Sequence, residues 1–231
     1  MALQWLILVL LAFLPPLAYT VWIRNTERYH REPWLPVFIC FTWGATIAVI
    51  ASLFLENIAG VSLASLGNAS LYAFAMAVIV APVVEEFTKP LALNIGTVRR
   101  ELDEIEDGLI YGAAAGLGFS ATENLFYEIS FMDEGLAIFV TLVVLRTIGA
   151  CLLHASATAL TGYGYGRSLL RQKGSVLPYF GLAIMVHAAY NFMASFQIAG
   201  IAIGVVFALL FSLFAIQYVR KKIRVFDRRH P

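Results

Sequence analysis

The chain has 231 residues, of which 60% are hydrophobic and 13% charged, and its formal net charge at pH 7 is +1. Soluble domains carry about 25% charged residues, so this composition, with a mean hydropathy of +0.79, excludes an ordinary soluble protein and indicates an integral membrane protein. No basic patch interleaved with aromatic residues supports nucleic-acid binding. Cys40 and Cys151 lie in apolar runs and are expected to be packed free thiols.

The chain contains seven apolar segments, judged against the ~20 residues that a spanning helix needs. These are residues 3–22, 35–55, 70–97, 108–127, 136–165, 176–196 and 198–219. The first lacks the positive residues that begin a signal peptide, so we interpret it as a membrane helix kinked at Pro15 and Pro16. The boundary near 197–200 is weak. The sequence therefore predicts an all-α, polytopic protein of the cell membrane, with one domain over 1–231.

The basic residues predict the orientation of these helices. All but two of the 16 Lys and Arg follow the first, third, fifth and last segments, and none lies in the alternate loops around 56–68 and 128–135. Because cytoplasmic loops are enriched in Lys and Arg, we expect the N-terminus outside and the C-terminus in the cytoplasm. The final RKKIRVFDRRHP is expected to contact anionic lipid. The segments show no internal repeat, which disfavours an inverted-repeat transporter.

The fourth segment carries glycines at intervals of four, Gly108, Gly112 and Gly116. A ridge of small residues lets a neighbouring membrane helix approach closely. We interpret the ridge as a packing device that brings this helix against another one carrying functional groups.

Residues 80–92 place three ionisable groups, Glu85, Glu86 and Lys89, inside the third apolar segment. Ionisable residues at membrane depth are costly and often functional. Glu85 and Lys89 have the i,i+4 spacing of an intrahelical ion pair. Glu86 points about 100° away from Glu85 on a helix of 3.6 residues per turn, so the two carboxylates are not expected to share one environment. Pro90 is expected to interrupt the helix beside them.

Other spans contain further polar residues, which are Glu123, Asn124, Arg146, His154, His187 and Asn191. At a rise of ~1.5 Å per residue, Glu85, His154 and His187 lie roughly 17–20 Å from the nearest cytoplasmic loop, and Glu123 roughly 24 Å. Four helices thus place carboxylates and imidazoles in one layer. Such a set can bind a metal or activate water, whereas Arg146 is expected to serve as a counter-ion for Glu123 or Glu128.

The motifs of several intramembrane proteases are missing from the sequence. It has no H-E-x-x-H zincin motif, no G-x-S-x-G, no serine and histidine spaced as a rhomboid-like dyad, and no aspartate pair within spans. The remaining reaction type is hydrolysis in which glutamate and histidine side chains activate a water molecule as the nucleophile. A proton or ion transporter that uses the carboxylates as a relay and a non-catalytic scaffold are the alternatives.

The ordered motifs resemble the PrsW intramembrane proteases, within a superfamily that includes CAAX prenyl endopeptidases and bacteriocin-processing proteins. The resemblance covers most of the chain. The residues that carry it are EPW (32–34), EEFTK (85–89), DGLIYGAAAGLGFSATEN (107–124), Arg146 with His154, and HAAYN (187–191). Phe119 and Glu123 match the PrsW version of a motif that has histidine at the second position in CAAX enzymes.

The resemblance implies catalytic roles for Glu85, Glu86, Lys89, Glu123, His154, His187 and Asn191. Glu85 would be the base, Lys89 would tune its charge, and His187 with Asn191 would stabilise an oxyanion. A zinc ion, where present, would be held by Glu123, His154 and His187, with Glu86 as a further candidate. The implied reaction is hydrolysis of a single-span membrane protein in the bilayer, as in the site-1 cleavage of anti-sigma factors.

A CAAX-like or bacteriocin-processing peptidase would use the same residues on a different substrate. The sequence leaves open the substrate and cleavage position, the metal requirement, which glutamate is the base, the side from which the substrate arrives and the oligomeric state.

Overall fold

The computed structural model describes residues 2–171, 175–195 and 201–228, which are helical with no strand among them. Within these residues, six helical segments are long and apolar enough to cross a membrane. They are Leu3–Arg24, Trp34–Leu63, Ala69–Asn94, Leu136–Leu170, Leu177–Ser195 and Ile203–Asp227. They coincide with six of the seven expected segments, so the all-α, polytopic fold class is confirmed. The weak boundary near 197–200 lies outside the described residues.

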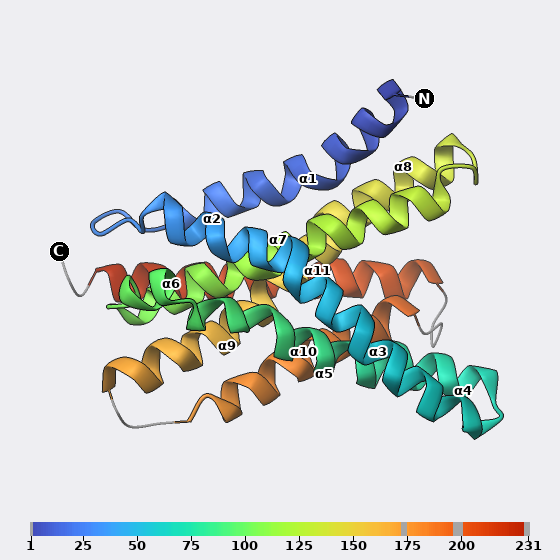
Figure 1. Ribbon diagram of the computed structural model, residues 1–231. Coiled ribbons are helices and arrows are strands. Elements are labelled where there is room, and N and C mark those ends of the chain that lie inside the picture. Colours follow the sequence, from blue (N-terminus) through green and yellow to red (C-terminus); the bar gives the residue numbers. More distant parts are fainter. Residues whose placement is uncertain (1, 172–174, 196–200, 229–231) are drawn as a thin grey trace.

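The remaining predicted segment, 108–127, lies within α7 (Ile105–Phe131), a 27-residue helix that is less apolar than the six. α7 occupies the centre of the bundle and packs against α9 (Cys151–Arg171), α1 (Ala2–Arg24) and α2 (Trp34–Trp43) (Figure 1). Its N-terminal half is buried without interruption. Because protein rather than lipid surrounds this half, small and polar residues replace the apolar side chains that a lipid-facing helix needs.

Three of the long helical segments contain a π-helical turn, namely η1 (Gly44–Ala48), η3 (Ala75–Val80) and η5 (Arg146–Ala150). Single π turns are rare and frequently lie at functional sites. Here η3 precedes the helix that carries Glu85, and η5 precedes the one that carries His154. The other elements are α3 (Val49–Leu63), η2 (Ala64–Leu66), α4 (Ala69–Phe74), α5 (Ala81–Thr88), η4 (Lys89–Asn94), α6 (Gly96–Arg100), α8 (Leu136–Leu145), α10 (Leu177–Ser195) and α11 (Ile201–Asp227).

The prolines affect their helices differently. The expected irregularity at Pro90 is present, because α5 ends at Thr88 and the chain continues as the 3-10 helix η4. A proline removes a backbone donor and clashes with the preceding turn, which explains the change of helix type. Pro15 and Pro16, in contrast, lie inside the continuous helix α1.

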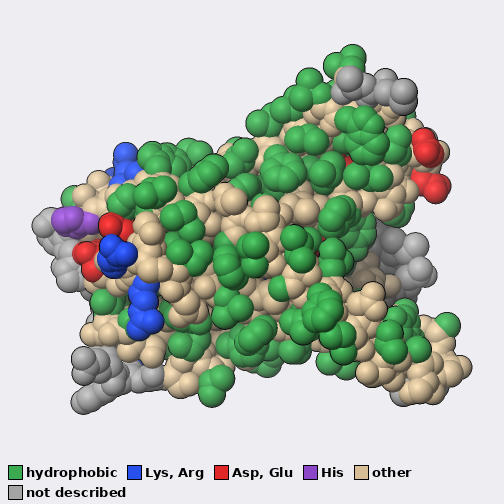
Figure 2. All heavy atoms as spheres, in the orientation of Figure 1, with side chains coloured by type: hydrophobic (Ala, Val, Ile, Leu, Met, Phe, Trp, Pro, Cys, Tyr) green, Lys and Arg blue, Asp and Glu red, His purple; other side chains and the backbone are tan. Residues whose placement is uncertain are grey.

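The bundle has two different ends. At one end, α8 and the last turns of α7 splay away from α3 and α4, while the α1–α2 loop and the end of α11 lie at the other (Figure 1). The face seen in Figure 2 has a broad belt of apolar side chains, with charged side chains gathered at its two ends. An apolar belt between two charged ends is the surface that a lipid bilayer requires.

The glycine ridge of α7 packs directly on the backbone of α9. A methyl group at Gly112 would lie 2.6 Å from the carbonyl oxygen of Thr158, and one at Gly116 would overlap the carbonyl oxygen of His154. The expectation that the ridge brings α7 against a helix with functional groups is therefore confirmed. The packing sets the distance between Glu123 on α7 and His154 on α9.

Replacing Gly116 by alanine is expected to destabilise the protein by about 1–3 kcal/mol, the usual cost of overpacking, because the new methyl group would push α9 away from α7. Gly181→Ala on α10 is the matched control, since nothing lies within 4 Å of a methyl group there. Thermal unfolding of both variants in detergent measures the difference. Equal unfolding temperatures for the two variants would contradict the close packing of these helices.

Candidate active site

The two adjacent glutamates of α5 share one buried cation. Lys89 Nζ lies 3.1 Å from Glu85 Oε2 and 2.7 Å from Glu86 Oε1, and the lysine is fully buried. The expectation that the two carboxylates do not share an environment is wrong in this respect. The long lysine side chain, one turn further along, reaches both carboxylates although they leave the helix in different directions.

The two glutamates differ in their access to a cavity. A cavity of about 430 Å³ is lined by Glu85 but not by Glu86. Glu86 is fully buried and accepts hydrogen bonds from Lys89 Nζ and from Thr158 Oγ1, the latter at 2.9 Å. Its Oε1 also lies 2.9 Å from His187 Nδ1. Glu86 is thus an internal anchor, and Glu85 is the member of the pair that a molecule in the cavity can contact.

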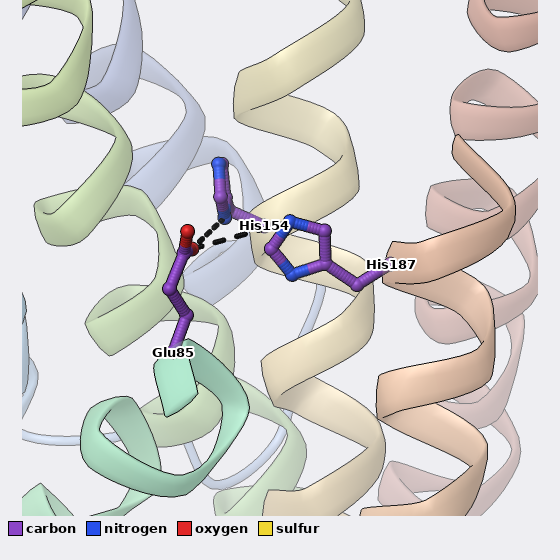
Figure 3. Close-up of side chains that lie close together, drawn as sticks. All are labelled: Glu85, His154 and His187. Atoms are coloured by element: carbon purple, nitrogen blue, oxygen red, sulfur yellow. Dashed lines mark ion pairs between the residues drawn. The ribbon is translucent and has the colours of Figure 1, made fainter. Parts of the chain in front are cut away.

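Each of the two histidines is held by a carboxylate on one ring nitrogen. His154 Nε2 lies 2.8 Å from Glu123 Oε2, and His187 Nδ1 lies against Glu86. The other nitrogens, His154 Nδ1 and His187 Nε2, lie 3.7 and 4.0 Å from Glu85 Oε2 (Figure 3). The rings are nearly perpendicular, with centroids 4.9 Å apart. Both histidines therefore turn one nitrogen toward Glu85, from α9 and α10.

Glu123 is held in turn by the arginine of η5. Arg146 Nη2 donates to Glu123 Oε2 at 2.8 Å, and Arg146 Nε donates to Asn124 Oδ1 at the same distance. Arg146 is therefore the counter-ion that the sequence predicts. Asn124 also donates to Cys151 Sγ at 3.3 Å, which joins α7 to α9. Cys151 and Cys40 are buried free thiols, as expected.

Phe119 and Asn191 complete the wall around these groups. The ring centroid of Phe119 lies 4.6 Å from Lys89 Nζ and 5.6 Å from the ring of His154, so the aromatic face covers the buried ammonium. Asn191 lines the cavity and donates from Nδ2 to the carbonyl oxygen of Ala77 at 2.9 Å. Ala77 lies in the π turn η3, where the altered ladder leaves carbonyls in need of donors.

Four residues that the sequence reasoning did not single out belong to this site. Thr158 holds Glu86, while Glu56, Tyr127 and Tyr190 line the cavity. Of these four residues, Glu56 has a feature that the sequence alone could have revealed, because it is a carboxylate near the end of an apolar segment. Glu56 is expected at the start of the loop around 56–68, but α3 continues to Leu63. Tyr127 follows Glu123 at the i,i+4 spacing of one helix face, whereas Thr158 and Tyr190 have common side chains with no distinctive spacing.

The donor set at the cavity could hold a metal ion. Ligand atoms of Glu85, His154 and His187 lie within 4.8 Å of one another, and two imidazoles with one carboxylate are a known zinc-binding combination. Carboxylates behind metal-bound histidines are also typical, because they fix the ring orientation. Glu123 and Glu86 occupy those positions behind His154 and His187.

Lys89 also contacts this donor set. Its Nζ lies 3.0 Å from His154 Nδ1 in addition to its contacts with both carboxylates of the pair. The ammonium thus stands beside the space enclosed by the three donors and supplies a positive charge there.

The cavity lies between apolar helices and is walled by carboxylates and by histidines bound to carboxylates, a setting that a protease acting within the membrane would need. The model of the PrsW family intramembrane metalloproteases matches residues 32–217. The chain therefore belongs to the PrsW family. It is an intramembrane protease and a multi-pass protein of the cell membrane.

Three relatives named Protease PrsW show different extents of similarity. The protein of Clostridioides difficile (strain 630) is 36% identical over 124 residues, 53% of this chain and 51% of the relative. That of Shouchella clausii is 26% identical over 201 residues, 81% of this chain and 83% of the relative. That of Geobacillus kaustophilus is 25% identical over 183 residues, which are 78% of this chain and 76% of the relative. No solved structure matches the chain. Family membership favours the protease over the transporter and the scaffold that the sequence left open.

Proposed function

We propose that the protein hydrolyses a peptide bond of a single-span membrane protein at the cavity beside Glu85. The observation that carries this proposal is the orientation of the two histidines. Each has one ring nitrogen bound to a carboxylate and the other turned toward Glu85 (Figure 3). Side chains held in fixed orientations can act on a water and a scissile carbonyl, which is the basis of electrostatic catalysis.

A polar wall and an apolar wall of the cavity suit a membrane-embedded peptide. The polar wall consists of the groups around Glu85, and the apolar wall comes from α8, with Leu142 and Leu145, and from α11, with Val205 and Leu209. No residue of α8 is buried, so this helix would face the lipid from which a substrate helix arrives. An anti-sigma-factor-like protein with one membrane span is the substrate class that we propose, with this reaction as its first cleavage.

Glu85, His154 and His187 would hold a zinc ion, which when bound lowers the pKa of a coordinated water and polarises a carbonyl. This set differs from the expected one in that Glu85 replaces Glu123, whose carboxylate holds His154 instead. Arg146 neutralises Glu123, and Lys89 neutralises Glu86. Each histidine is thereby held in a single orientation of its own. Asn191, on the cavity wall, would donate to the developing oxyanion.

Chelation tests the metal assignment. Treatment with 1,10-phenanthroline is expected to abolish cleavage of a reporter peptide with one membrane span, and added Zn²⁺ is expected to restore it. Elemental analysis should find about one zinc per chain, because one three-ligand site holds one ion. His187→Ala should lose this zinc, whereas His30→Ala, at an exposed position, should keep it. Full activity after removal of all metal would show that Glu85 acts as a base without one.

A further inference from the structure

A second group of carboxylates lies at the opposite end of the bundle from α8, between the α1–α2 loop and the start of α7 (Figure 1). Ligand atoms of Glu27, Glu32 and Asp107 lie within 4.8 Å of one another. The three residues are 1%, 4% and 1% exposed. Buried carboxylates at this spacing repel one another when ionised, so a proton or a cation must neutralise part of their charge.

The described residues supply no positive side chain to this group, since no Lys, Arg or His forms an ion pair with any of the three carboxylates. The two nearby arginines are used elsewhere. Arg24 Nε donates to the backbone oxygen of Glu32 at 2.6 Å, and Arg31 Nε donates to that of Glu27 at 3.1 Å. Arg24 acts on Glu27 and Glu32 only through longer-range electrostatic attraction, so no cation of the described residues contacts the cluster directly.

Glu27 Oε1 and Asp107 Oδ1 are buried and accept no hydrogen bond from an N–H group or hydroxyl of the described residues, while the side chains of Asp107 and Glu32 lie close enough to share a proton. The second oxygen of each residue accepts hydrogen bonds from the backbone. Glu27 Oε2 accepts from the backbone N–H of Glu32 at 3.1 Å. Asp107 Oδ2 accepts from the backbone N–H groups of Asp103 and Glu104 at 2.9 and 2.5 Å. Those bonds fix both carboxylates. A buried acceptor without a partner is rare in folded proteins and indicates a missing ion or water.

The third carboxylate is also fixed. Glu32 Oε2 accepts a hydrogen bond from the hydroxyl of Tyr111 on α7. Burial and the neighbouring carboxylates raise the pKa of Glu27 to about 8 and that of Glu32 to about 11. These shifts show that three anions are unfavourable here, and a bound cation would compete with protons for the carboxylates.

We propose that Glu27, Glu32 and Asp107 form a binding site for a divalent cation that prefers oxygen ligands, Mg²⁺ or Ca²⁺. All donors are carboxylate oxygens, with no nitrogen or sulfur among them, which selects these hard ions over zinc. The cation would join the α1–α2 loop to the first turn of α7. The same loop is tied to α11, because Asp227 accepts from the backbone N–H groups of Arg28 and Tyr29, both at 3.1 Å. The site would thus hold three helices at one end of the bundle.

Terbium luminescence tests the site in the full-length protein in detergent, because Tyr111 beside Glu32 can sensitise a bound Tb³⁺. After treatment with EDTA, the wild type is expected to show saturable emission that excess Ca²⁺ or Mg²⁺ displaces, and the ion that displaces at lower concentration is the preferred one. The same ion is expected to raise the unfolding temperature. The absence of displaceable emission in the wild type, with no thermal shift, would mean that a proton occupies the cluster and would overturn the proposal.

Matched variants test whether the Tb³⁺ emission arises from this carboxylate cluster. Glu27→Gln and Asp107→Asn are each expected to weaken Tb³⁺ binding at least tenfold, and both amides can still accept the backbone hydrogen bonds that fix the side chains. Asp133→Asn, at an exposed position in the α7–α8 connection, should bind as the wild type does. Glu85→Gln should also bind normally, which separates this site from the proposed zinc site. Unchanged binding in Glu27→Gln and Asp107→Asn would overturn the assignment.

Discussion

Replacing Glu85 by glutamine is expected to lower the rate of peptide cleavage about a thousandfold, within the range that a positioned acid, base or ligand contributes. Glutamine has nearly the same shape, but it cannot take up a proton or carry the negative charge that faces the cavity. Glu86 still pairs with Lys89 in this variant, so the protein should remain folded. Cleavage of a single-span reporter in liposomes, with thermal unfolding as a check on folding, measures both effects.

Two further variants serve as comparisons for the Glu85 variant. Glu134→Gln changes an exposed glutamate outside the cavity and should leave the rate unchanged. Glu86→Gln should also reduce cleavage, because the amide no longer holds His187 Nδ1 and Lys89 as the carboxylate does. Wild-type activity in both the Glu85 and the Glu86 variants would exclude the proposed chemistry.

Replacing Lys89 by methionine is expected to destabilise the protein by about 3–5 kcal/mol, the cost of breaking a buried ion pair by removing one partner. Methionine fills similar space but leaves Glu85 and Glu86 without the ammonium that contacts both. The recovery of folded protein from membranes and the unfolding temperature in detergent measure the loss. Lys221→Met, at an exposed position on α11, is the control and should behave as the wild type.

A second substitution identifies the cause of the Lys89 effect. The double variant Lys89→Met with Glu86→Gln should unfold at a higher temperature than Lys89→Met alone, because it removes one of the two uncompensated charges. If the double variant is less stable than the single one, packing of the lysine stem rather than its charge stabilises the site.

Much of the candidate site could be predicted from helical depth alone. Glu85, Glu123, His154 and His187 were expected in one layer of the membrane, and ion pairs or hydrogen bonds connect them in the structure. Depth follows directly from the rise per residue of a helix. The partner of each group could not be predicted in the same way, because it depends on the rotation of each helix about its axis.

The π turns show why the rotation of each helix about its axis could not be predicted from the sequence. η3 and η5 each insert an extra residue into a helical turn just before Glu85 and His154, which changes the direction of the side chains that follow. Neither turn has a sequence pattern that marks it. The position of Glu56 on the cavity wall was missed because the sequence predicts a loop there, whereas α3 continues to Leu63.

The sequence by itself determined that this protein is a helical membrane protein, which charges lie within its spans, and which family its motifs resemble, because apolar length and residue spacing are properties of the chain alone. The tertiary structure decided which glutamate of the adjacent pair faces the cavity. Glu86 became the internal anchor because Thr158 and His187, from two other helices, converge on it. Only the packing of α9 and α10 against α5 could bring those partners to one carboxylate and leave Glu85 open to the cavity.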